Sequence, residues 1–431
     1  MREEIYVALV MFVISIGGSI ATKNDKKWSV FFLFLAAVAG SLVAGMGIRF
    51  REIVEGPFGF LDSLLCVFSA SLLVFCLNKS GAFELLLKKI SLIKCSVLKA
   101  FLVLFFIALP SMLTGFASAS ILTTGKLVGS AIEDKKKASI VVIVGSFLGV
   151  ILPPNCIPAI IAANGAGSVL PTPYVGFFLP LLIIALPSFI FFAIYQRKAL
   201  ASVNPKANEE SKEETKPEKG AVLSLIILAL VGVAVLIDGL LASFVYIGGL
   251  TLVFFVATIL VIAVCKCFGS AKTTLEVLSE GAMKAVVPMA IVFALGSFIE
   301  VSSMTGVRGL YSLWILPYDS RYVMLVLMAA SLVIGYFFSI PIPAFLITYA
   351  VFPIGWLANT VVVSGCSVAL ALVALITCKG GITEEVYKNI GLEGKVDKTT
   401  WAKNILPVAF LVLVIGVVMV LCGNNMSFLI L

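Results

Sequence analysis

The chain contains no histidine among its 431 residues. This absence excludes acid–base catalysis by imidazole, Ser-His and Cys-His nucleophile pairs, and zinc, copper or haem sites with a histidine ligand. It also excludes a proton relay through histidine. Most classes of membrane enzyme and redox protein therefore do not fit this sequence, and we expect a protein that is not an enzyme and has no cofactor.

Charge is also scarce. Only 13% of the residues are charged, against about 25% in a typical soluble protein, while 61% are hydrophobic and the mean hydropathy is +1.15. This composition indicates a polytopic membrane protein. The net charge of +8 comes mostly from lysines in short loops between apolar runs, as the positive-inside rule expects.

The nine cysteines mostly lie inside apolar runs, where cysteine behaves as a small hydrophobic residue. Only Cys265 and Cys267 form a close pair, and without histidine or a second pair they predict no metal site. At the N-terminus, Glu3 and Glu4 precede an apolar run where a signal peptide would have basic residues. We expect this segment to be a retained membrane span.

The most informative apolar run, at 145–168, reads GSFLGVILPPNCIPAIIAANGAGS. Pro153 and Pro154 lack backbone donors and stop a helix. In lipid, a broken helix is tolerated only where protein or a water-filled cavity covers the freed backbone groups. Secondary transporters use such breaks to build a site near the membrane midplane, and we include Asn155 in it. The alternative is a proline kink in an ordinary spanning helix.

Lysine-rich loops at 79–99 and 133–137 both belong on the cytoplasmic side, which places the N-terminus outside. The apolar segment 97–131 between these loops must then enter and return on the same side. It predicts a re-entrant hairpin whose small, polar tip supplies hydroxyl and carbonyl oxygens. The tip residues singled out are Thr114, Gly115, Ser118 and Ser120. The alternative is two full spans packed closely together.

The second half repeats this order more loosely. An apolar run is interrupted at Ser339, Pro341 and Pro343, and a later one stops at Cys378 and Lys379. We predict an all-α fold with about 11–12 membrane elements in two inverted repeats, each with a re-entrant hairpin and a broken helix. The expected parts are scaffold spans at 1–57 and 220–284, a first repeat at 58–195, a solvated cytoplasmic linker at 196–219, and a second repeat at 285–431.

Four stretches, VFCLNKSGAFELLLKKI, LTGFASASILTTGKLVGSAI, SFLGVILPPNCIPAIIAANGAGS and PYVGFFLPLLII, follow one another in the first half. In this order the chain resembles the large membrane (M) subunit of TRAP transporters, in the ion-transporter superfamily of elevator-type carriers. The sequence departs from that family at Cys378-Lys379, where a second proline pair is usual. It also departs at the hairpin tip, where the family is richer in Gly and Ser.

The resemblance implies uptake of a small organic anion, such as a C4-dicarboxylate or a sialic-acid-like carboxylate, across the bacterial inner membrane. It also implies coupling to a gradient, with sodium held at Ser118 and Ser120. A small membrane subunit and an extracytoplasmic solute-binding protein would be the partners. Half-helix N-termini near Asn155 and Pro343 suit a carboxylate, because they carry partial positive charge.

Glu300 lies in the apolar sequence SFIEVSS. A carboxylate inside a helix bundle is a candidate cation ligand or proton carrier, although a residue near the membrane surface is the alternative. Three other functions remain open. The first is a stand-alone dicarboxylate or citrate carrier of the same superfamily, for which proton coupling is the alternative to sodium. The others are a structural membrane protein and, least favoured, a membrane enzyme.

Overall fold

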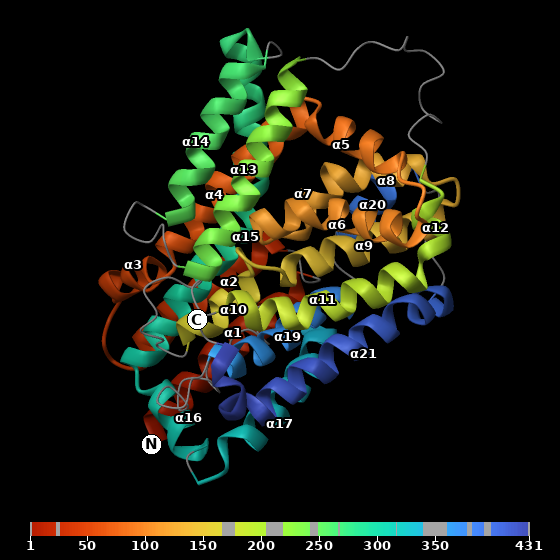
Figure 1. Ribbon diagram of the computed structural model, residues 1–431. Helices are drawn as coiled ribbons and strands as arrows, with labels where there is room; N and C mark the ends of the chain where they lie inside the picture. The colour runs from red at the N-terminus through yellow and green to blue at the C-terminus, as the bar shows by residue number, and fades with distance from the viewer. Residues whose placement is uncertain are drawn as a thin grey trace.

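The computed structural model is an assembly of helices in which broken and bent elements cross near the centre (Figure 1). It describes residues 2–22, 26–165, 177–203, 219–241, 249–265, 268–315, 317–338, 360–376, 382–391 and 398–429. These ranges contain no strand, so the predicted all-α class is confirmed.

The helices of the first half are α1 (Arg2–Ala21), α2 (Lys26–Val43), α3 (Phe50–Phe58), α4 (Leu61–Lys79), α5 (Ala82–Ser91), α6 (Ser96–Thr114), α7 (Ala117–Leu122), α8 (Thr124–Ala131), α9 (Lys135–Ile151), α10 (Ile157–Gly165), α11 (Phe178–Tyr195) and α12 (Arg197–Ala201). Those of the second half are α13 (Lys219–Leu241), α14 (Gly249–Val264), α15 (Ala271–Met304), α16 (Val307–Ile315), α17 (Ser320–Phe338), α19 (Thr360–Ile376), α20 (Ile382–Ile390) and α21 (Lys398–Cys422), followed by the short 3-10 segment η5 (Gly423–Leu429).

Within the described ranges, six helices are long and apolar enough to cross a membrane: α4, α6, α11, α13, α15 and most of α21. Their outward faces are apolar as well. Leu230 on α13 and Ile259 on α14 are more than 60% exposed, which in water would be unfavourable but in lipid is the expected state. The chain is a multi-pass membrane protein.

The two halves share a local signature at corresponding places. Helix α4 is followed by Gly81 and the short helix α5, and helix α15 is followed by Gly306 and the short helix α16. Both glycines are left-handed, with φ of 77° and 76°, a conformation that residues with a Cβ rarely adopt. The same turn therefore reverses the chain after the first long helix of each repeat.

The helices that flank the predicted breaks show how the two halves lie against each other. In the first half α9 and α10 are the two pieces, and in the second half α19 and α20 are. Helix α10 packs against α19, and α20 packs against α9. The first piece of each half thus lies beside the second piece of the other, which is the arrangement of two antiparallel elements.

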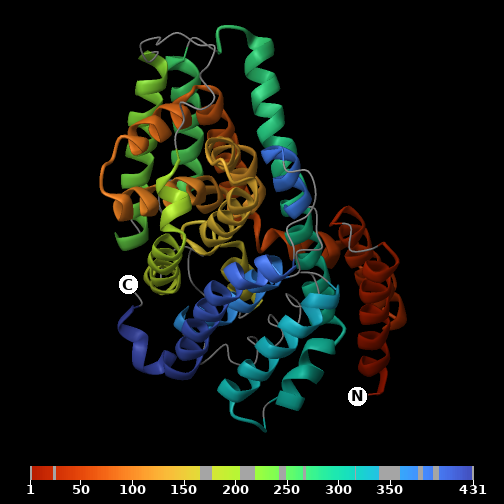
Figure 2. The same ribbon diagram turned by 90° about the vertical axis from the view of Figure 1, so that its right-hand side faces the viewer.

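Helices α1 and α2 stand together at the edge of the molecule (Figure 2) and form a separate small core with α15 and α16. Helix α3 crosses α15 at close range, since a Cβ on Gly56 would lie 2.4 Å from the Gly296 carbonyl oxygen. Ser71 on α4 also donates a hydrogen bond of 2.7 Å to the Gly281 carbonyl of α15. The long helix α15 is therefore the element to which the other scaffold helices attach.

Three of the predicted boundaries differ from the helices. The boundary between 57 and 58 falls inside α3, and that between 284 and 285 falls inside α15, because one helix of 34 residues carries both the basic stretch and the span. The linker also begins later than residue 196. Helix α12 buries Ala199 and Leu200 and packs against α6, so apolar side chains within a charged sequence extend the folded part to Val203.

Helix α9 begins at a well-defined N-cap. The Asp134 carboxylate accepts hydrogen bonds from the amides of Lys136 and Lys137 and pairs with the Lys137 ammonium at 3.1 Å. Burial raises the pKa of Asp134, but these hydrogen bonds and the nearby positive charge outweigh it and hold the pKa below its usual value.

Replacing Asp134 with alanine should destabilise the protein by about 1 kcal/mol through the lost cap. Asp134→Asn keeps a capping oxygen and should cost less. The charge contributes in full above the unfolded pKa of about 3.9, and its contribution disappears as the pH falls through the lower folded pKa. Thermal unfolding in detergent from pH 7 to pH 3 measures both effects. Equal melting temperatures for the wild type and Asp134→Ala at pH 7 would contradict this role.

Candidate functional site

The predicted hairpin is present. Helix α6 ends at Thr114, Gly115 turns the chain with φ of 76°, and α7 and α8 lead back along α6. Two hydroxyl contacts fix the register of the arms. The Ser120 hydroxyl accepts a hydrogen bond from the Ser111 amide at 2.8 Å, and the Thr124 hydroxyl donates to the Ile107 carbonyl at 3.2 Å.

From the first contact to the second, the residue on α6 moves one turn back, from Ser111 to Ile107, while the residue on the second arm moves one turn forward, from Ser120 to Thr124. The arms are therefore antiparallel. Ser111 also donates its own hydroxyl to that of Ser120 at 2.6 Å. The second arm thus satisfies backbone groups of α6 next to Pro110, which lacks an amide donor of its own. This geometry agrees with the re-entrant interpretation of 97–131.

The predicted helix break is also present. Helix α9 ends at Ile151 and α10 begins at Ile157, with Pro153 and Pro154 between them, joined by a cis peptide bond. Asn155 follows the prolines and is completely buried. An ordinary kinked span is excluded, because the two pieces are separated by five non-helical residues.

The hairpin tip sits on the helix break. A Cβ at Gly115 would lie 2.2 Å from the Asn155 carbonyl oxygen, so the two backbones touch where only a glycine fits. The Asn155 side chain donates a hydrogen bond to the Leu113 carbonyl at the end of α6. The structure therefore brings Thr114, Gly115 and Asn155 together, with Pro153 and Pro154 buried beside them.

One polar atom at this junction has no protein partner. The Oδ1 atom of Asn155 is buried and accepts no hydrogen bond from the described residues. Such an orphaned acceptor costs about 1–3 kcal/mol unless a ligand satisfies it. The nearby Thr114 hydroxyl donates to the Pro110 carbonyl at 2.7 Å and keeps its lone pairs. Two oxygen acceptors at a junction of this kind suit a cation or a ligand that donates hydrogen bonds.

The two serines of the tip have different surroundings. Ser120 is buried and its hydroxyl is used in the contact with Ser111. Ser118 is half-buried, and two residues along a helix of 100° per residue place it on nearly the opposite side of α7. The structure does not bring these two hydroxyls to a common point, and the sodium site proposed for them stays a prediction.

Glu300 is not part of this junction. Its β-carbon packs against Gly56, where α3 crosses α15, and the residue is half-buried. Met289, which reaches the hairpin tip, is 11 residues away, or about 16 Å along the helix axis. The residues Ser339, Pro341 and Pro343 and the interruption at Cys378-Lys379 lie outside the described residues.

Sequence reasoning missed the contact between the tip and the scaffold. A small apolar cluster joins Phe116 and Ala119 of the hairpin to Val67 on α4 and Ala285 on α15. Ile157, at the start of α10, and Met289 pack against it. The available signal was a bulky Phe116 among small residues at a turn, a position where only a partner surface explains an aromatic side chain.

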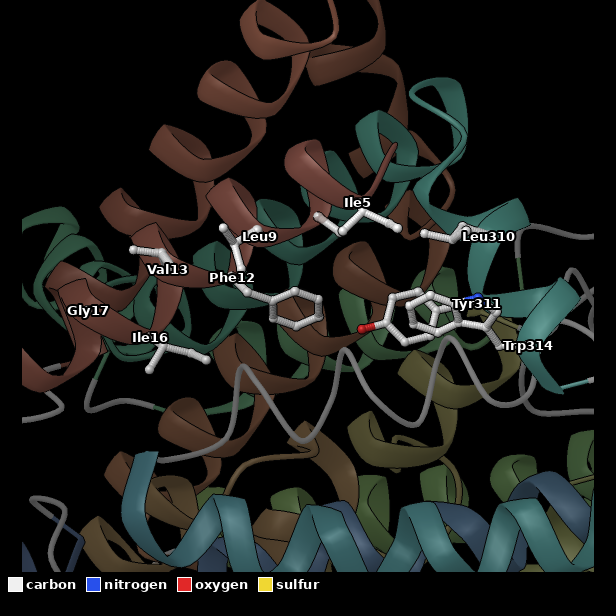
Figure 3. A pocket seen from close by; sticks show the side chains of 10 residues that line it. Ile5, Leu9, Phe12, Val13, Ile16, Gly17, Leu310, Tyr311 and Trp314 are labelled. Carbon is white, nitrogen blue, oxygen red and sulfur yellow. The ribbon is translucent and has the colours of Figure 1, made fainter. Parts of the chain in front are cut away.

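A separate groove of about 530 Å³ lies between α1 and α16 (Figure 3). Its lining is apolar apart from the Tyr311 hydroxyl and the Trp314 indole N–H; Phe12, Tyr311 and Trp314 point into it in the close-up view. Such a lining has almost nothing to hydrogen-bond a polar solute. The junction of hairpin and broken helix is therefore the better candidate for a substrate or ion site.

No family model and no curated protein matches the chain, but solved structures do. The YdaH transporter of Alcanivorax borkumensis, whose structure is described as having an unusual topology, superposes with a TM-score of 0.62 at 13% identity, covering 93% of this chain and 98% of that one. MtrF of Neisseria gonorrhoeae, described as illuminating a class of antimetabolite efflux pumps, gives a TM-score of 0.55 at 13% identity, covering 91% and 94%.

Replacing Gly115 with alanine should push the hairpin tip off the helix break, because the new methyl group meets the Asn155 carbonyl. The matched control is Gly47→Ala. Gly47 is also left-handed, with φ of 68°, but has no atom within 4 Å of its would-be Cβ. Both variants carry the same backbone strain, and only Gly115→Ala adds the clash. We expect normal insertion for both and loss of solute transport only for Gly115→Ala; equal transport by the two would contradict the docked tip.

At 13% identity, the similarity of this chain to YdaH and MtrF concerns the fold alone. Both structures are of transporters, and neither is a TRAP large subunit, so the predicted TRAP identity gains no support from them. The hairpin and the broken helix predicted for the first half are present, whereas those predicted for the second half lie outside the described residues. The chain has the fold of a membrane transporter.

Proposed function

We propose that this protein is a secondary transporter that moves a small organic anion across the membrane as a single chain, driven by an ion gradient. The observation that carries the proposal is the buried, unpartnered oxygen of Asn155 at the junction of hairpin tip and helix break. A buried acceptor without a partner is unfavourable unless a ligand or a water molecule satisfies it, so we take this oxygen as a position that a ligand contacts.

The chemistry of the junction suits two ligands of opposite charge. Helix α10 points its N-terminus at the break, and its partial positive charge favours a carboxylate. The oxygens of Asn155 and Thr114 favour a hard monovalent cation. A cation beside a carboxylate would neutralise the pair as it moves through a medium in which isolated charges are costly.

The direction of transport and the need for partners are separate matters. Uptake, a small membrane subunit and a binding protein follow only from the TRAP resemblance. The similarity to MtrF favours export as a second candidate, since that protein is described with antimetabolite efflux pumps. Both directions use the same site, and neither requires enzymatic chemistry.

Reconstitution of the chain alone in proteoliposomes tests the proposal. Fluxes of labelled mono- and dicarboxylates would be measured in both directions under a sodium gradient, a pH gradient or none. We expect gradient-driven flux of at least one carboxylate without other proteins. Flux only after addition of a binding protein and small subunit would restore the TRAP assignment, and no flux of any carboxylate would sink the anion proposal.

Replacing Pro153 and Pro154 together with alanine should allow α9 to continue into α10. The backbone groups at the break would then bond within one helix, and Asn155 would leave the tip. Transport should fall by at least ten-fold while insertion persists, because alanine still partitions into lipid. Gly45→Ala, at a left-handed turn with no atom within 4 Å, serves as the control. Normal transport by the double variant would exclude a site at the break.

Three substitutions distinguish sodium from protons as the coupling ion. If sodium binds at the tip, Ser118→Ala should raise the sodium concentration for half-maximal flux by about ten-fold, corresponding to 1–2 kcal/mol for one lost ligand. Ser120→Ala should in addition lower the melting temperature, since its hydroxyl joins the hairpin arms. Glu300→Gln should then change little. Flux that ignores sodium, follows pH and is abolished by Glu300→Gln would instead indicate proton coupling.

A further inference from the structure

Residues 79–137 carry nine lysines and no arginine against three acidic residues. Most of the lysines gather where the hairpin begins and ends. Lys88 and Lys89 lie in the last turn of α5, Lys94 lies in the turn that follows, and Lys136 lies at the start of α9. All four are exposed.

The register of the hairpin places these segments side by side. Ser111 opposite Ser120 and Ile107 opposite Thr124 bring Ala131 level with Ala100. The turn at 132–134 and the start of α9 therefore lie next to the first turn of α6. Helix α5 also contacts α6 and α8, and Figure 1 shows α5 and α8 at the same end of the bundle.

Part of this charge is already used inside the protein. The Lys137 ammonium pairs with Asp134, and the Lys135 ammonium lies 3.1 Å from the Gly129 carbonyl at the end of α8. Lys89, Lys94 and Lys136 form no ion pair with another described residue. Their ammonium groups are exposed and can therefore pair with anions outside the protein.

Apolar side chains are exposed among these lysines. Leu92, between Lys89 and Lys94, is 75% exposed, the highest fraction among the large hydrophobic side chains of the described residues. Val97 and Leu98 follow at the start of α6 and are also exposed. Because α6 is a membrane span, this leucine lies at the level where the helix leaves the hydrocarbon.

We infer that the lysine surface, formed by Lys88, Lys89, Lys94 and Lys136 around Leu92, binds anionic phospholipids of the cytoplasmic leaflet. The lysines would pair with phosphate headgroups while Leu92 enters the acyl region. A basic cluster directly next to a membrane span binds anionic lipid with a gain of about five-fold in affinity per lysine. A soluble phosphate compound fits less well, because the surface is open and because such a compound has no apolar part for Leu92 to contact.

The surface lies at the base of the hairpin whose tip closes the candidate site. Lipid bound there would hold the ends of α5, α6 and α9 together at the membrane face. Anionic lipid should therefore stabilise the folded protein as well as bind to it. This effect does not depend on the solute carried, so it can be tested even if the proposed transport function is wrong.

The experiment uses the purified full-length chain in neutral detergent, with phosphatidylglycerol or phosphatidylcholine added. Retained lipid is counted by native mass spectrometry, and the melting temperature is followed against lipid concentration. We expect preferential retention of phosphatidylglycerol and a rise in melting temperature. In Lys89→Gln/Lys94→Gln the phosphatidylglycerol affinity should fall on the order of twenty-fold, and Leu92→Ser should also weaken it.

The matched control is Lys272→Gln/Lys403→Gln, which removes the same charge from exposed positions on α15 and α21 and should leave the affinity unchanged. Lys89→Arg/Lys94→Arg keeps the charge and should bind like the wild type, even if the glutamine variant folds poorly. Equal losses in the control pair would overturn the inference. So would an identical stabilisation by inorganic phosphate, which would assign the surface to a soluble anion.

Discussion

The structure depends on one junction, where the hairpin tip rests on the helix break that two prolines make inside a membrane protein. Pro153 and Pro154 interrupt the helix ladder where water is not available to replace it. The hairpin tip packs directly on this break. The side-chain amide of Asn155 donates a hydrogen bond to the Leu113 carbonyl at the end of α6, and Gly115 allows the two backbones to touch. The hairpin and the break therefore shield part of each other's backbone.

This mutual dependence explains why the fold is built as two interlocked repeats. The two pieces of the first-half broken helix lie against the second half, so that α10 packs on α19 and α9 packs on α20. The long helix α15 and α4 form the surface on which the hairpin tip rests, through the cluster around Phe116 and Ala285. That contact is small and apolar, with no ion pair among its described members, whereas the tip and the break are joined by hydrogen bonding and backbone contact.

Much of this arrangement could be predicted from residue patterns. Lysines on both sides of 97–131 favoured a hairpin over two full spans, and consecutive prolines favoured a break over a kink, because both follow from local chemistry and from the membrane as solvent. The helical boundaries inside 266–304 could not be predicted, since α15 has a basic start and an apolar end within one helix. The separation of Ser118 from Ser120 also escaped prediction, as it depends on which face of α7 meets α6. Glu300 was predicted as a functional acid because it lies in an apolar run; the structure places it beside Gly56 at a helix crossing, and its role stays a prediction.

The hydroxyl contacts between the hairpin arms bear on how solvent could reach Asn155. Ser120 and Thr124 fasten the second arm to α6 at two levels, and α6 is in turn held along its length by Gly145 and Gly149 of α9. If the second arm moved away from α6 at the tip, at least one of these two hydrogen-bonded contacts would break. The serine or threonine hydroxyl of that contact would then be exposed to hydrocarbon. Hydrogen bonds and close packing thus join the arms and α9 into one block, whereas the contact of the tip with α4 and α15 around Phe116 is apolar. Access to the buried oxygen would then alternate by movement of that block past α4 and α15, with its internal hydrogen bonds intact.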